Sequence, residues 1–184
     1  MTLKEMKTKV LALIEELNSS SKLLTDDPDI AAKINHVMCQ VMYELARIKK
    51  IGKYVELPVK KGQLLDFEEI GSAAGYNIFQ VVSVQGVENQ TKADGRIFKI
   101  LENGIAEIDC FVYPTQITEN TGDGYEFELD EDVLEIMPYG VAADLLKSDV
   151  STEYGSVYAT RYESMLQRLD PRSATGSIYI EGGW

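Results

Sequence analysis

The residues best suited to binding a metal are His36 and Cys39, which stand three positions apart in a segment with helical spacing. Side chains at that spacing lie on one helix face, and an imidazole and a thiolate are both common zinc ligands. Zinc needs four ligands, or three and a water, and the chain contains no second histidine. The pair therefore indicates helix packing, and we expect neither a metal nor another cofactor.

A second candidate chemistry is acid–base catalysis by paired carboxylates, which hydrolyses glycosides when the two groups are held at a fixed separation. Nothing in the sequence fixes two carboxylates in this way, so a solvated strand face is the expected role of this group. The chain also lacks a G-x-S-x-G elbow and both glycine-rich phosphate-binding motifs. We therefore expect no enzyme and no catalytic residue. The carboxylates concerned are Asp66, Glu68, Glu69, Glu107 and Asp109.

A basic cluster occupies the stretch from residue 49 to residue 61. Cations near a helix C-terminus complement the helix dipole, which is one explanation. The other is a docking surface for an acidic partner or for DNA phosphate, and the sequence leaves both open. The cluster consists of Lys49, Lys50, Lys53, Lys60 and Lys61.

Tyrosine dominates the aromatic residues, with ten Tyr against five Phe and one Trp. A tyrosine ring buries area while its hydroxyl keeps a hydrogen bond, so a tyrosine-rich surface fits either a core or an interface. A terminal strand that follows a flexible link can add to a neighbouring sheet, which favours the interface. The candidate oligomer contacts are Tyr139, Tyr154, Tyr158, Arg161, Tyr162, Ile178, Tyr179 and Ile180.

Helices at both ends of the chain must position these residues. Apolar residues recur at helical spacing over residues 2–19 and 27–50, and the short linker between them favours an antiparallel hairpin. Thr2 and Glu5 form a capping box at the first start. Residues 129–169 predict a second hairpin, in which Pro138 should kink or restart the first helix.

The middle of the chain has the alternation of strands. We expect Cys110 in the core, because residues 105–113 alternate between apolar and polar side chains. Asn103 and Gly104 predict a tight hairpin between the last two strands. Residues 71–75 and 87–94 have loop composition. The expected strands cover 53–59, 64–70, 77–84, 95–101 and 105–113.

The sequence therefore predicts an α+β fold of four parts. The N-terminal helical hairpin (1–52) packs with the C-terminal helical hairpin (129–170). An antiparallel β-sandwich or half-barrel of five to seven strands (53–128) is inserted between them, and a C-terminal arm (171–184) carries a short strand.

The formal net charge of −12 is unevenly distributed. Residues 1–62 carry 11 cationic and 8 acidic side chains, whereas residues 63–184 carry 7 and 22. An acidic body is poorly suited to tight nucleic-acid binding and keeps a protein in solution. Cys39 and Cys110 form no disulfide framework, and no stretch has the composition of a signal peptide or membrane span. Cytosolic synthesis is the expectation.

One region resembles a known family. It combines an acidic strand end at 125–130, the run MPYGVAADLLK at 137–147, and a tyrosine-rich helix containing Arg161, Tyr162 and Glu163. This order resembles the head-tail adaptor (connector or neck) proteins of tailed bacteriophages and prophages. The resemblance covers the last third of the chain well. The rest follows the family only as a loose plan, with helices before a β-rich middle.

The resemblance implies a structural virion protein, assembled in the host bacterial cytoplasm, without a membrane. It implies a homo-oligomeric ring, with a dodecamer expected, that sits under the portal and contacts portal and tail proteins. DNA would pass through the ring without sequence-specific binding, along its acidic face. The alternative is a β-sandwich binding module of another tail or baseplate component, with Tyr76, Phe79 and Phe111 as candidate contacts.

Overall fold

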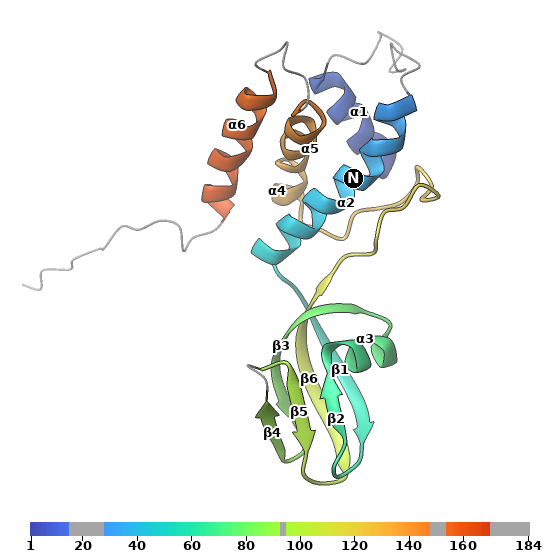
Figure 1. Cartoon of the computed structure of the whole chain (residues 1–184), viewed down its shortest axis with the longest axis vertical. Helices are drawn as coiled ribbons and strands as arrows, with labels where there is room; N and C mark the ends of the chain where they lie inside the picture. The colour runs from blue at the N-terminus through green and yellow to red at the C-terminus, as the bar shows by residue number, and fades with distance from the viewer. Residues whose placement is uncertain (15–27, 93–94, 148–153, 170–184) are drawn as a thin grey trace, which may run out of the picture.

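The computed structural model describes residues 1–14, 28–92, 95–147 and 154–169 (Figure 1). Within these ranges the fold is α+β, as predicted, with all helices but α3 gathered at one end and the strands, with α3, at the other. The helices are α1 (Leu3–Leu13), α2 (Pro28–Ile48), α3 (Phe67–Ala74), α4 (Glu131–Leu134), α5 (Met137–Leu145) and α6 (Tyr154–Leu169). The strands are β1 (Ile51–Val59), β2 (Leu64–Asp66), β3 (Asn77–Gln85), β4 (Asn89–Lys92), β5 (Ile97–Ile100) and β6 (Gly104–Tyr113).

Helices α1, α2, α4, α5 and α6 form a helical platform with α5 at its centre. This short helix contacts α1, α2 and α6. Its residues Met137, Val141 and Ala142 are fully buried in one core that also contains apolar side chains of α1 and α2. No helix among the described residues is long and apolar enough to cross a membrane.

Local signals explain where these helices begin. The Thr2 hydroxyl accepts from the Glu5 amide at 3.3 Å, and the Glu5 carboxylate accepts from the Thr2 amide at 2.8 Å, which is the predicted capping box. Helix α1 ends at Leu13, and residues 15–19 of the predicted helix lie outside the described residues. Pro138 lies in the first turn of α5, directly after α4 has ended, so the predicted restart is confirmed.

The β-domain consists of two three-stranded antiparallel sheets and α3. Strand β6 lies between β1 and β3, and β5 lies between β2 and β4. Cys110 is 1% exposed, as predicted from the alternation of β6. The inner faces of both sheets and α3 contribute to one core, whose fully buried members include Ile70, Ile100 and Ile108.

Four sequence expectations for the β-domain are wrong. Residues 64–70 do not form one strand, because β2 ends at Asp66, which caps α3; the expected loop at 71–75 is largely the rest of that helix. Part of the expected loop at 87–94 is β4. The hairpin across Asn103 and Gly104 does not form, since β5 and β6 belong to different sheets.

The failed hairpin has a local cause. The Asn103 side chain accepts a hydrogen bond of 2.8 Å from the backbone N–H of Lys61, so it joins the β1–β2 turn. Gly104 is not among the glycines with positive φ, which a tight hairpin turn requires at both central positions. The chain therefore crosses from one sheet to the other at this point.

The platform and the β-domain meet at an aromatic joint. The Tyr113 ring at the end of β6 stacks on Tyr43 of α2, with centroids 4.6 Å apart, and lies 4.7 Å from Phe79 of β3. Arg47 donates from Nε to the Tyr113 hydroxyl at 2.5 Å. Because α2 also leads into β1 after only two residues, the joint fixes the β-domain against the end of α2 (Figure 1).

Candidate interaction site on helix α6

The candidate metal ligands do not share an environment. On α2, Cys39 is buried in the platform core whereas His36 is exposed. Helix packing is therefore confirmed for Cys39 and wrong for His36. In the described part of the chain, no three His, Cys, Asp or Glu side chains are grouped so that they could hold a metal ion.

The candidate acid–base carboxylates divide between two places. Asp66 accepts from the Glu69 amide at 2.8 Å and Glu69 accepts from the Asp66 amide at 3.4 Å, so this pair caps α3. Glu107 and Asp109 lie on the outward face of β6. Helix capping, rather than proton transfer, explains the geometry of the first pair.

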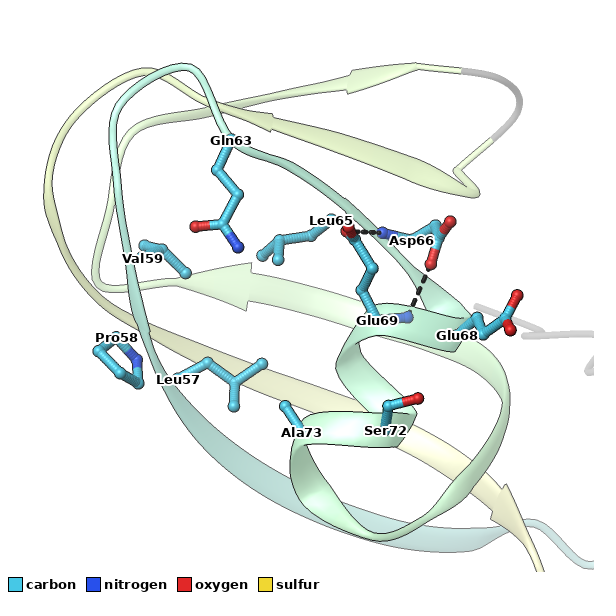
Figure 2. A pocket seen from close by; sticks show the side chains of 10 residues that line it. All are labelled: Leu57, Pro58, Val59, Gln63, Leu65, Asp66, Glu68, Glu69, Ser72 and Ala73. Carbon is cyan, nitrogen blue, oxygen red and sulfur yellow. Dashed lines mark hydrogen bonds between the residues drawn. The ribbon is translucent and has the colours of Figure 1, made fainter.

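An open groove of about 700 Å³ lies beside the capping pair, between β1, β2 and α3 (Figure 2). Leu57, Val59 and Leu65 give it an apolar floor, whereas Glu68 is directed away from them (Figure 2). Its lining also contains the Ser72 hydroxyl, and of its carboxylates Asp66 and Glu69 are engaged in the cap of α3.

The five lysines of the basic cluster are not brought together. Lys49 forms an ion pair of 2.9 Å with Asp132, which raises the pKa of Lys49 and lowers that of Asp132. Lys50 lies 4.8 Å from the Phe111 ring centroid, beside the joint. Lys60 and Lys61 follow β1, at the end of the β-domain far from the platform (Figure 1).

Two tyrosines of α6 hold this helix on the platform. Tyr162 is 8% exposed and donates to Glu44 Oε2 of α2 at 2.9 Å. Its burial and the Glu44 carboxylate raise the pKa of its hydroxyl. Tyr158 donates to the Leu13 carbonyl of α1 at 2.6 Å. These contacts lie within one chain.

Other predicted contacts lie on the surface of α6 or beyond it. Tyr154 is 55% exposed, and Arg161 is exposed while its guanidinium lies 4.4 Å from the Tyr139 ring centroid. The predicted strand of Ile178, Tyr179 and Ile180 lies outside the described residues. The structure thus leaves Tyr154 and Arg161 accessible to a partner.

Two adjoining hollows follow α6, and we call them together the α6 groove. They share Arg161 and Met165. The first, of about 580 Å³, lies along the outer face of α6 and also includes Val157 and Arg168. The second, of about 490 Å³, lies between α6, α5 and α1.

The charge of the α6 groove is opposite to that of the chain as a whole. Among the described residues that line it are three cations, Lys9, Arg161 and Arg168, and one carboxylate, Glu135. Sequence reasoning identified Arg161 but missed Arg168, although a spacing of seven residues places both on one helix face. It could not find Lys9, because α1 meets α6 only in the tertiary fold. The groove can bind an acidic surface through charge-assisted hydrogen bonds.

No protein-family model matches the chain, and no match was found among curated proteins.

Proposed function

We propose that the chain is a structural subunit of a head-tail adaptor in the particle of a tailed bacteriophage or prophage. The observation that carries this proposal is the position of α6. One face of this helix is fixed on the platform by Tyr158 and Tyr162, and the opposite face is a groove with exposed Val157 and Arg161. A ring subunit needs such a surface, because each copy must present one patch to each neighbour.

The two-part shape also suits a ring subunit. The platform has its own core, and the β-domain, which has a second core, projects from it (Figure 1). Side-to-side contacts of platforms would close the ring and leave the β-domains projecting. In this arrangement portal and tail proteins would contact the two ends of the molecule.

The outward face of the β1–β6–β3 sheet is a suitable channel wall. Glu56 lies directly opposite Glu107 across β1 and β6, and Tyr54 lies opposite Asp109. The Tyr54 hydroxyl donates a hydrogen bond of 3.1 Å to Glu56. Like charges directly opposite one another destabilise a sheet, so this face serves something other than fold stability. Repulsion of the DNA duplex during its passage is the role that we assign to it.

The proposal assigns the protein to a virion assembled in the bacterial cytoplasm, and it assigns no catalysis. The alternative, a tail or baseplate binding module, needs free aromatic side chains on the sheet. Of its candidates, Phe79 packs at a tilt against Tyr113 and Phe111 lies under Lys50. That leaves Tyr76, which is 40% exposed and has its ring centroid 5.5 Å from the Lys53 ammonium. This side of the molecule therefore supports the alternative less well.

Co-expression with the portal protein of the same genome tests the adaptor function. We expect a stable complex that electron microscopy resolves as a second ring beneath the portal ring, with this chain in it. The portal protein of an unrelated phage is the control and should bind no such ring. If the portal of the same genome assembles alone and this chain remains apart, the adaptor function is wrong.

A further inference from the structure

We infer that the α6 groove of one copy of this chain binds the acidic segment 119–128 of a second copy. This inference rests on the proposed function and specifies the contact that would build the ring. It names both halves of a heterologous contact: a basic helix face on one side of the platform and acidic side chains on the other.

Helix α6 and segment 119–128 lie on opposite sides of the platform (Figure 1). Helix α5 lies between α6 on one side and α1 and α2 on the other. Segment 119–128 is attached to the first two turns of α1, because the Leu3 amide donates to the Tyr125 carbonyl at 2.8 Å and Lys7 pairs with Asp123 at 3.1 Å. A chain therefore cannot place this segment in its own α6 groove, but a neighbouring chain can.

Charge complementarity selects the second copy as the partner. The groove carries Arg161 and Arg168 on one helix face, whereas the segment carries exposed carboxylates. Two of those carboxylates have roles within the chain: Asp123 pairs with Lys7, and Glu128 accepts from the Thr115 amide and hydroxyl. We assign the intermolecular contact to the other two glutamates, Glu119 and Glu126.

The apolar and charged parts of the contact have different roles. Val157, 55% exposed, and the half-buried Met165 lie in the groove with the arginines and supply apolar area for burial. Opposite charges at the rim of an interface fix register and speed association more than they add affinity. A contact of this kind weakens as salt rises, because surface charges are screened.

Complementary charge reversals test the contact. One variant carries Arg161→Glu and Arg168→Glu, and the other carries Glu119→Lys and Glu126→Lys. Each should self-associate at least about tenfold more weakly than the wild type in sedimentation velocity over a concentration series, since a loss of about 1.4 kcal/mol is tenfold in an equilibrium constant. Mixed in equal amounts, the two variants should associate again.

The mixture is decisive because of the geometry of a heterologous contact. The acidic α6 of the first variant meets the basic segment of the second, and the unchanged α6 of the second meets the unchanged segment of the first. Both contacts are then complementary, and native mass spectrometry should find the two variants in equal numbers. A folding defect, which the loss of Arg161 from Tyr139 could cause, would not be repaired by mixing.

The control is the pair Lys92→Glu and Arg96→Glu on exposed positions of the β-domain, which changes the net charge as much as the arginine variant does. It should associate like the wild type. If the mixture does not recover, or if the control is equally impaired, this contact is wrong. A wild type that stays monomeric throughout the series also overturns it.

The outcome for the adaptor function is read separately. If each charge-reversal variant alone still forms a ring on the portal, this contact is wrong and the adaptor function is unaffected. Recovery in the mixture without any ring on the portal would support the contact and overturn the function.

Discussion

Tyr162 of α6 donates a hydrogen bond of 2.9 Å to Glu44 of α2, although 118 residues separate the two in the chain. The same tyrosine ring lies against Gly140 of α5, where an added Cβ would stand 2.8 Å from Tyr162 Cε2. One side chain thus connects the last helix to both the first long helix and the centre of the platform.

Removing only the hydroxyl should weaken this connection. Tyr162→Phe keeps the ring against Gly140 but loses the hydrogen bond to Glu44, whose carboxylate is exposed and can be hydrated instead. We expect a loss of about 1 kcal/mol in the free energy of unfolding, the usual net value of one such bond. Urea denaturation followed by circular dichroism measures it. Tyr154→Phe, at an exposed position of the same helix, should cost nothing measurable, and equal losses would contradict the assignment.

Adding one methyl group at Gly140 should destabilise the platform. In an exposed helix, Gly→Ala normally gains about 1 kcal/mol. Here the new Cβ meets a buried ring, so we expect Gly140→Ala to cost about 1–3 kcal/mol, as overpacking does in a close-packed core. Thermal or urea denaturation of the full chain shows whether the variant is less or more stable than the wild type. A more stable variant would show that the Tyr162 ring moves aside without cost.

The cap of α3 offers a prediction for the β-domain. Asp66→Ala removes the acceptor for the Glu69 amide, and we expect a loss of about 1 kcal/mol. Asp66→Asn is the matched control, because asparagine caps helices about as well as aspartate. Hydrogen exchange at the amides of α3 measures the effect locally. If Asn and Ala are equally destabilising, the charge of Asp66 matters more than its cap.

The helix starts at Thr2 and Pro138 were predictable, because a capping box at the first and a proline at the second stood within an apolar stripe. The same signal occurs at Asp66 and Glu69, but the apolar residues around it also fit a strand, and a short helix gives too few turns for its period to decide. The sheet assignment of β5 was not predictable, because the Asn103–Lys61 bond that redirects the chain joins residues 42 positions apart.

The roles of the individual tyrosines could not be predicted from the sequence. Their clustering near Arg161 pointed to α6, but composition could not separate the buried Tyr162 from the exposed Tyr154. That difference depends on Gly140, which admits the Tyr162 ring from another helix. The groove likewise combines side chains of α1, α5 and α6, which only the fold brings together.

Alkaline pH should destabilise the platform through Tyr125. Burial and the Glu128 carboxylate raise the pKa of its hydroxyl to about 12, and this hydroxyl donates to the Thr115 carbonyl at 3.1 Å. An unfolded tyrosine has a pKa of about 10. Because the folded pKa is the higher one, the stabilisation is complete below pH about 10 and is lost as the pH rises toward about 12.

Absorbance at the tyrosinate band and circular dichroism, recorded together against pH, measure this loss. We expect a late step in tyrosinate formation that coincides with a loss of helix signal. The Tyr125→Phe variant lacks the hydrogen bond to Thr115 and should be less stable at neutral pH. Its free energy of unfolding should nevertheless fall less steeply as the pH rises through the same range. An unchanged slope would assign the alkaline loss to other tyrosines, among which Tyr162 also has a raised pKa.

The aromatic joint should set how firmly the β-domain is held. Tyr113→Ala removes the stack on Tyr43, the contact with Phe79 and the acceptor of Arg47, while both cores keep their other side chains. Each aromatic pair contributes about 0.5–1.5 kcal/mol to stability beyond the effect of its buried area. The substitution removes two such pairs, so it should weaken the attachment of the β-domain to the platform.

We expect faster hydrogen exchange at the end of α2 and the end of β6, with little change in the centres of the two domains. Small-angle scattering should show a broader range of domain orientations. Tyr54→Ala is the control, because Tyr54 is exposed on the same sheet and away from the joint. If exchange at both ends of the joint is unchanged in Tyr113→Ala, the short link from α2 to β1 is enough by itself to hold the β-domain in place.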